Sequence, residues 1–166
     1  MNLDKTVTDV VKLLKQRHET IATAESCTGG MLSAYLTSVD GASAVFECGI
    51  CTYANRIKEM LVHVPHSVLE EYGAVSRQTA SAMVQGIREL TGADLCVSVT
   101  GIAGPQGGTP DKPVGTVFVG FCYHEKQWVY LLKLWHADGH GRSFNRETTA
   151  AFVMKTAEKI LMEEDS

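Results

Sequence analysis

Residues 22–30 read Ala-Thr-Ala-Glu-Ser-Cys-Thr-Gly-Gly (ATAESCTGG), a polar, glycine-containing stretch that follows a short β-prone run. Its ordinary interpretation is a strand over Thr20–Ala24 that ends here and a helix over Gly29–Ser38 that begins. A second interpretation makes Ser26 a nucleophile at the helix start, where the amides of Cys27 to Gly30 lack internal acceptors and can bind a developing oxyanion. The residues alone support a helix-capping Ser26 and a catalytic Ser26 equally.

Helix and strand patterns alternate on both sides of this stretch. Apolar residues recur at helical spacing over 3–15, and an apolar, β-prone strand over 45–54 ends at Tyr53. The remaining predicted elements are a short helix over 58–61 that Pro65 ends, a helix over 77–90 between Ser76 and Gly92, a strand over 93–100, a hairpin of 114–123 and 127–135, and a final helix over 142–162. This order predicts one domain, residues 1–166, with a three-layer α/β/α fold and a mixed, mostly parallel sheet.

The composition narrows the class of protein. The chain has 166 residues, of which 45% are hydrophobic and 20% charged, as is usual for a single globular domain. A net charge of −4 without a Lys/Arg cluster argues against nucleic acid or an anionic membrane as the main partner. No apolar run approaches the roughly 18 residues that span a bilayer. Five cysteines, an odd number in a chain of ordinary size, suit a reducing cytoplasm, so we expect a cytoplasmic protein.

Three polar or glycine-rich segments follow predicted strands: one after Ala24, one near Tyr53 and one after Thr100. Because ligands of open α/β sheets bind beyond the strand ends, these segments are expected to form one site. A nucleophilic serine needs a base, and the six histidines are scattered without a pattern. Lys58, on the first helical turn after Tyr53, could serve if burial lowers its pKa. Taken by itself, a lysine in this position is more commonly a solvated helix residue.

The loop over 100–115, TGIAGPQGGTPDKPVG, holds five glycines and three prolines. It matches neither a P-loop nor the G-x-G-x-x-G fingerprint. Exposed amides and hydroxyls at a strand end nevertheless suit phosphate or carboxamide recognition, which we favour over an ordinary surface loop. Arg142 and Arg146, one turn apart at the start of the last helix, either clamp a phosphate or belong to a solvated helix face.

The cysteines and histidines do not form a metal motif. Cys48-Gly49-Ile50-Cys51 lacks a second pair and lies in a predicted strand, so we expect buried cysteines there. His63-Val64-Pro65-His66 has no carboxylate at metalloprotease spacing, and no metal is assigned. Cys27 is a rival nucleophile because a thiolate is stabilised at a helix start.

Taken in order, TAESCTGG, TYANRIK, YGAVSRQTASAMVQG and VTGIAGPQGGTPDKPVGTV resemble the C-terminal domain of the CinA (competence/damage-inducible protein) family. The resemblance covers roughly residues 5–160, and the wording of the first and last motifs is very specific. One departure is that His140-Gly141-Arg142 stands where relatives usually have Gly-Asp-Arg.

The resemblance implies a nicotinamide mononucleotide amidohydrolase that gives nicotinate mononucleotide and ammonia without a metal or organic cofactor. It puts the family's nucleophile on Ser26, its lysine on Lys58 and its tyrosine on Tyr53. The residues expected to bind substrate are Cys27, Thr28, Gly29, Gly30, Thr100, Gly101, Gly104, Arg142 and Arg146. The expected partners are a pyridine nucleotide and further copies of the chain, with no nucleic acid and no membrane.

Three alternatives stay open at this point. The departure at His140-Gly141 favours a non-catalytic member that binds a nucleotide or regulates a partner. A different amide or pyridine nucleotide could be the substrate. The third alternative is a thiol enzyme that depends on Cys27.

Overall fold

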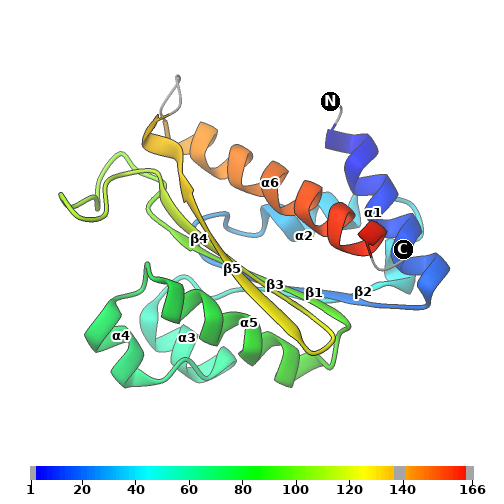
Figure 1. Ribbon diagram of the computed structural model, residues 1–166, viewed down its shortest axis with the longest axis horizontal. Coiled ribbons are helices and arrows are strands. Elements are labelled where there is room, and N and C mark those ends of the chain that lie inside the picture. The colour runs from blue at the N-terminus through cyan, green and yellow to red at the C-terminus, as the bar shows by residue number, and fades with distance from the viewer. Residues whose placement is uncertain (1–2, 137–140, 164–166) are drawn as a thin grey trace.

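Alternating helices and strands build a five-stranded mixed sheet, which the computed structural model describes for residues 3–136 and 141–163 (Figure 1). The strands are β1 Ile21–Glu25, β2 Phe46–Cys51, β3 Leu95–Gly101, β4 Thr116–Tyr123 and β5 Lys126–Lys133. They lie in the order β2-β1-β3-β4-β5. β1 is parallel to both of its neighbours, whereas β4 is antiparallel to both of its own. Four strands therefore run one way and β4 the other, which confirms the predicted mixed, mostly parallel sheet.

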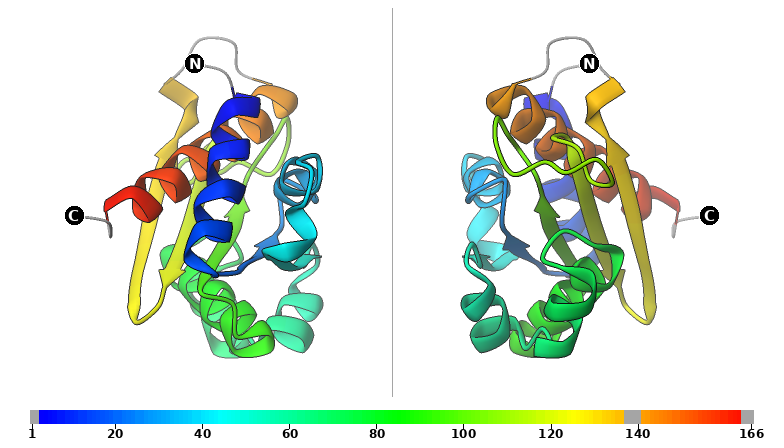
Figure 2. Two further views of the ribbon diagram at one scale, coloured as in Figure 1. Left: turned by 90° about the vertical axis from the view of Figure 1, so that its right-hand side faces the viewer. Right: turned by 90° about the vertical axis from the view of Figure 1, so that its left-hand side faces the viewer.

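Helices cover both faces of the sheet, as predicted for a three-layer fold. The first layer contains α1 Leu3–Arg17, α2 Met31–Thr37 and α6 Arg142–Glu163. The second contains α3 Asn55–Val62, α4 His66–Tyr72 and α5 Arg77–Thr91. Figure 2, which views the molecule from two further sides, shows the sheet between the two layers, with β2 near one edge and β5 at the other.

Two apolar clusters, one on each face, hold the layers to the sheet. The first includes Ile21 of β1 with residues of α1, α2 and α6, and the second includes Ala22 and Ala24 of β1 with residues of α5. All five residues of β1 are buried, because a central strand covered on both faces exposes neither set of side chains. The end of β1 is consequently a rigid place from which to present a side chain.

Most predicted element boundaries are off by one to three residues, and three of the differences affect the site. α2 begins at Met31 and not at Gly29, because Gly29 and Gly30 have φ of 63° and 92°, a left-handed conformation that glycine adopts without strain. β2 ends at Cys51, two residues before Tyr53. Helix α4 was not predicted: α3 ends at Val62, where His63 has a left-handed φ of 51°, and Pro65 is the residue that caps the start of α4.

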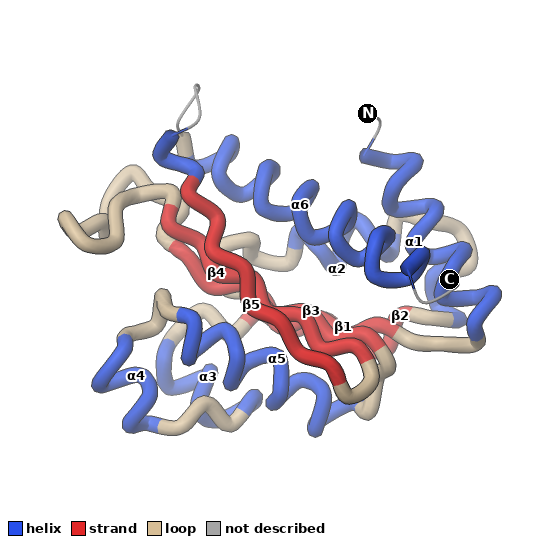
Figure 3. The backbone as a smooth tube through the Cα atoms, viewed as in Figure 1, coloured by secondary structure: helices blue, strands red, loops and turns tan. Residues whose placement is uncertain are grey.

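The connections that follow β1, β2 and β3 all begin at the carboxyl-terminal ends of these parallel strands, on the same side of the sheet. The chain passes from β1 to β2 through α2 on one face and returns from β2 to β3 through α3, α4 and α5 on the other. The strand order therefore reverses next to β1, and open α/β sheets bind ligands at such a switch point. The long loop between β3 and β4 projects beyond the sheet near the start of α6 (Figure 3).

Within residues 3–136 and 141–163, none of the helices combines the length and the apolar character that crossing a bilayer requires. The longest of them, α6, carries charged residues along its length.

Gly86 of α5 sets how closely α3 approaches, and this contact can be tested. A Cβ atom at Gly86 would collide with the backbone carbonyl of Val62 at the end of α3. We expect Gly86→Ala to lower the free energy of unfolding by about 2 kcal/mol, in the range of overpacked cores, despite the better helix propensity of alanine. Urea denaturation measures the change, with the exposed neighbour Gln85→Ala as the control. An equally stable or more stable Gly86→Ala protein would contradict this packing.

Candidate active site

Ser26 directly follows β1 and is held by the strands on either side. Its amide donates to the carbonyl of Val99 in β3 at 3.0 Å, and the amide of Thr52, just after β2, donates to the carbonyl of Glu25 at 2.8 Å. These bonds continue the parallel ladder past the ends of β1 and β2, so the position of Ser26 is fixed by the sheet. Its side chain is only 8% exposed.

Lys58 lies on the first turn of α3 and is 1% exposed. Its Nζ atom is 3.2 Å from Ser26 Oγ, 2.7 Å from the carbonyl oxygen of Thr52 and 3.2 Å from that of Tyr53. A neutral amine has two N–H donors and one lone pair. When the two carbonyls accept both N–H groups, the lone pair is left for the hydroxyl of Ser26. The arrangement suits a base that removes the proton of Ser26.

Burial is the main cause of the shifted pKa values of Lys58 and Cys27. It lowers the pKa of Lys58, with a smaller opposing effect from Cys27. Burial also raises the pKa of the Cys27 thiol, to about 12, although Arg142 and Arg146 act in the opposite direction. The thiol therefore stays protonated at neutral pH and supplies no negative charge that would hold Lys58 as an ammonium. A protonated, buried Cys27 argues against the thiol-enzyme alternative.

The expected oxyanion donors are only partly available. The Gly29 amide donates to the carbonyl of Ser26 at 3.0 Å, and the Gly30 amide donates to the carboxylate of Glu25 at 3.1 Å. Within the described part of the chain, the amides of Cys27 and Thr28 have no backbone acceptor. The predicted set of four amides is thus reduced to these two, because the glycines form a turn before α2.

Glu25, a residue not predicted to contribute to the site, is fully buried at the end of β1. Its carboxylate also accepts from the amides of Leu32 and Ser33 and from the Ser33 hydroxyl, at 3.0–3.1 Å. The signal was present, since an acidic residue shortly before a helix is a typical partner for its unpaired first-turn amides.

A cavity of about 210 Å³ opens beside Ser26 and Lys58. Its lining residues among those described are Ser26, Cys27, Tyr53, Lys58, Ala74, Val75, Thr100, Gly101, Ala103 and Arg142. The structure thus brings together all three predicted catalytic positions with Cys27, Thr100, Gly101 and Arg142. The turn between α4 and α5, which supplies Ala74 and Val75, was not predicted to contribute. It is held in place by the Thr100 hydroxyl, which donates to the carbonyl of Ala74 at 2.6 Å.

The other residues predicted to bind substrate do not line this cavity: Thr28, Gly29, Gly30, Gly104 and Arg146. Arg146 donates to the carbonyls of Cys27 at 3.1 Å and Thr28 at 2.9 Å, so its guanidinium grips the Ser26 turn. Arg142 donates to the carbonyl of Gly104 at 2.9 Å and to the Tyr53 hydroxyl at 3.2 Å.

Tyr53 is 62% exposed, and its backbone carbonyl, not its phenol, is the group that contacts Lys58.

The departure from the usual family sequence before Arg142 includes His140, which lies outside the described residues.

The cysteines of β2 correct one expectation. Cys48 is half-buried and Cys51 is exposed, whereas both were predicted to be buried. The reason is that β2 forms an edge of the sheet, so alternate side chains face outwards. Among the residues that the structure describes, no group of three or more His, Cys, Asp or Glu side chains is placed to hold a metal ion.

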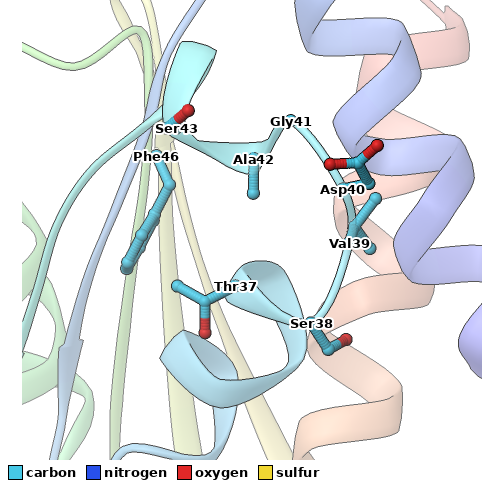
Figure 4. Close-up of a pocket in the computed structure, with 8 residues that line it drawn as sticks. All are labelled: Thr37, Ser38, Val39, Asp40, Gly41, Ala42, Ser43 and Phe46. Carbon is cyan, nitrogen blue, oxygen red and sulfur yellow. The ribbon is translucent and has the colours of Figure 1, made fainter.

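A larger hollow, of about 570 Å³, lies elsewhere and lacks comparable chemistry (Figure 4). It is lined by Thr37, Ser38, Val39, Asp40, Gly41, Ala42, Ser43 and Phe46, beyond the C-terminal end of α2. Ser26 precedes the opposite end of that helix. The lining offers hydroxyls and one carboxylate but neither a base beside a nucleophile nor a cation, so the smaller cavity is the better candidate for catalysis.

Comparison with known proteins supports the same family as the four sequence motifs, the CinA C-terminal domain family. The model of the CinA C-terminal domain family matches residues 3–161. A CinA-like protein of Thermotoga maritima is 51% identical over 125 residues, which are 75% of this chain and 31% of that protein. A CinA-like protein of a Synechococcus species is 45% identical over 162 residues, 98% of this chain and 38% of that protein. The chain thus spans about a third of the length of these curated relatives.

The fold also matches solved structures of similar length. A competence/damage-inducible protein of Agrobacterium tumefaciens superposes with a TM-score of 0.88 at 33% identity, covering 99% of this chain and 96% of that one. A CinA superfamily protein of Klebsiella pneumoniae superposes with a TM-score of 0.91 at 28% identity, over 98% and 99% of the two chains.

The lowered pKa of Lys58 predicts a pH-dependent stability. Its value in the unfolded chain is near 10.5, so unfolding takes up a proton at every pH between the lowered folded value and 10.5. Stability due to this group therefore rises with pH across that window. We expect the unfolding free energy of the wild type to rise relative to that of Lys58→Met as the pH is raised from neutral towards 10.5.

Urea denaturation at a series of pH values measures this difference. Lys12→Met, on the exposed side of α1, is the control and is expected to keep the pH dependence of the wild type. If Lys58→Met also keeps the pH dependence of the wild type, the pKa of Lys58 is the same in the folded and unfolded protein, which would contradict the prediction.

Proposed function

This chain belongs to the CinA C-terminal domain family, and we propose that it is an amidohydrolase that converts nicotinamide mononucleotide to nicotinate mononucleotide and ammonia. One observation carries the proposal: a buried amine of lowered pKa, Lys58 Nζ, lies 3.2 Å from Ser26 Oγ at the wall of a cavity. A serine beside a neutral lysine is a nucleophile–base pair that needs no histidine.

In the proposed reaction, neutral Lys58 removes the proton of Ser26 while Oγ attacks the carboxamide carbon. The amides of Cys27 and Thr28 stabilise the oxyanion that forms. As the C–N bond breaks, the Lys58 ammonium gives its proton to the leaving nitrogen, which departs as ammonia. Lys58 then removes a proton from water, which attacks the acyl-enzyme. The carboxylic acid is released and Ser26 recovers its proton. The Tyr53 carbonyl keeps Lys58 oriented through both steps.

The cavity fits the reacting part of this substrate. At about 210 Å³ it is smaller than the roughly 300–1,000 Å³ of pockets for drug-sized ligands, so it suits a pyridine ring with its carboxamide, not a whole nucleotide. The ribose and phosphate would then lie outside, towards the loop between β3 and β4 and Arg142. A cationic pyridinium beside Lys58 would lower its pKa further.

The two arginines are proposed to divide their tasks. Arg142 is exposed at the mouth of the cavity, and its guanidinium has more N–H donors than its bonds to Gly104 and Tyr53 use. It is therefore the better candidate for the phosphate. Arg146 is half-buried and bound to the carbonyls of Cys27 and Thr28, which suits it to hold the Ser26 turn in place.

Substitution of Ser26 tests the nucleophile. We expect Ser26→Ala to lower kcat for ammonia release from nicotinamide mononucleotide by at least about 1,000-fold, because the covalent step is lost, while the substrate still binds. Cys27→Ala keeps the backbone amide and should lose far less activity, since the thiol is protonated. Ser43→Ala, at an exposed site in the short 3₁₀ helix after α2, is the control for any serine loss.

The outcomes separate the proposed function from its alternatives. Wild-type protein that binds nicotinamide mononucleotide and releases no ammonia would identify a non-catalytic nucleotide-binding member. Faster turnover of another carboxamide, compared by kcat/KM, would change the substrate. Activity that survives Ser26→Ala but not Cys27→Ala would establish the thiol enzyme.

Arg142→Gln tests phosphate recognition. Loss of a charge-assisted contact should raise KM for nicotinamide mononucleotide by roughly 10-fold or more. Nicotinamide riboside, which lacks the phosphate, should be turned over equally by the variant and the wild type. A rise in KM that is the same for both compounds would show that Arg142 shapes the loop and does not bind phosphate.

A further inference from the structure

We propose that Glu25 is a positioning residue that fixes Ser26 against Lys58, and this inference rests on the proposed function. Glu25 is the last residue of β1, immediately before Ser26, and its side chain is 0% exposed. A buried carboxylate is costly unless hydrogen bonds replace its water. Four donors do so here: the amides of Gly30, Leu32 and Ser33 at 3.1 Å each and the Ser33 hydroxyl at 3.0 Å.

These contacts require a carboxylate. Oε2 accepts from Gly30 and Leu32, and Oε1 accepts twice from Ser33, so both oxygens face donors only. A glutamine has the same shape but carries an NH₂ group on one side. Turned towards Gly30 and Leu32, its NH₂ meets two amide N–H donors; turned towards Ser33, it still meets the Ser33 amide N–H, although the hydroxyl can rotate to accept. Glutamine therefore cannot replace Glu25 without moving the turn that leads into α2.

The carboxylate closes the turn that contains the nucleophile. Residues 26–30 begin at β1 and end at Gly30, which Glu25 binds back to the strand. Within the turn, the Gly29 amide donates to the Ser26 carbonyl at 3.0 Å. The same turn carries the amides of Cys27 and Thr28 that are proposed to bind the oxyanion. Glu25 thus fixes both the hydroxyl of Ser26 and the donors next to it.

A closed ring of bonds passes from Glu25 to the base. The carbonyl of Glu25 accepts the amide of Thr52, the carbonyl of Thr52 accepts Lys58 Nζ, and Lys58 Nζ contacts Ser26 Oγ, which is joined to Glu25 through the backbone. The side chain of Glu25 points to α2 on one face of the sheet, whereas Lys58 comes from α3 on the other. Its effect on Lys58 is accordingly one of position.

Glu25→Gln in the full chain tests the inference through kcat, KM and the pH profile. We expect kcat to fall by about 100-fold, the cost of a displacement of about 1 Å in reacting groups. KM should change little because Glu25 does not line the cavity. The midpoint of the pH profile of kcat, which reports the ionisation of Lys58, should not shift. Glu47→Gln makes the same chemical change at an exposed site of β2 and should leave all three unchanged. A shifted pH midpoint would overturn positioning in favour of an electrostatic role.

A second readout does not depend on the substrate. A fluorophosphonate reacts with an activated serine, and its rate of attachment to Ser26, followed by intact mass, should be about as much slower in Glu25→Gln as kcat is. If the wild type is labelled at Ser26 but releases no ammonia, the proposed function fails while the labelling rates still test Glu25. If the folded variant reacts as fast as the wild type in both assays, Glu25 has no positioning role.

Ser33→Ala keeps the test decisive if Glu25→Gln does not fold. It removes one of the four donors and leaves the carboxylate and the three amides. We expect a smaller loss of kcat and of labelling rate than for Glu25→Gln, with faster hydrogen exchange at the amides of Gly30 and Leu32. Unchanged rates and exchange in Ser33→Ala would overturn the inference.

Discussion

A buried lysine whose amine is shared between two backbone carbonyls and one serine hydroxyl is the constraint on which the site depends. The parallel pairing of β1 and β2 puts Ser26 and Thr52 side by side, and the immediate start of α3 returns Lys58 to them. The burial that lowers the pKa of Lys58 also keeps Cys27 protonated, so one physical cause favours a neutral amine beside Ser26 and disfavours a thiolate at Cys27.

The first turns of α6 hold the site together from the opposite layer. Arg142 binds the carbonyl of Gly104, Asn145 binds that of Ala103, and Arg146 binds those of Cys27 and Thr28. These donors are all side chains, and the acceptors belong to two loops that begin at different strands. These contacts of α6 thereby set the distance between the turn that contains Ser26 and the loop between β3 and β4.

The layers and the mixed sheet could be predicted from periodicity, and the strand ends predicted that the segments of Ser26 and Lys58 meet at one site. The pairing of these two side chains was implied only by the family resemblance, because a lysine on a first helical turn is more commonly solvated. The structural tasks of Glu25 and Arg146 were not predicted, since both bind backbone groups whose availability depends on where α2 begins. That start was itself misplaced by two residues through the left-handed glycines. Ala74 and Val75 carry no chemical signal and enter the cavity only through the packing of an unpredicted helix, α4.

The hydrogen bonds from α6 to both loops have a consequence for how the site forms during translation. Ser26 and Lys58 are translated well before residues 142–146, and domains generally fold as units during synthesis. Until α6 has been translated, the carbonyls of Cys27, Thr28, Ala103 and Gly104 lack these side-chain donors. We therefore expect the cavity beside Ser26 to form only after α6 has been translated.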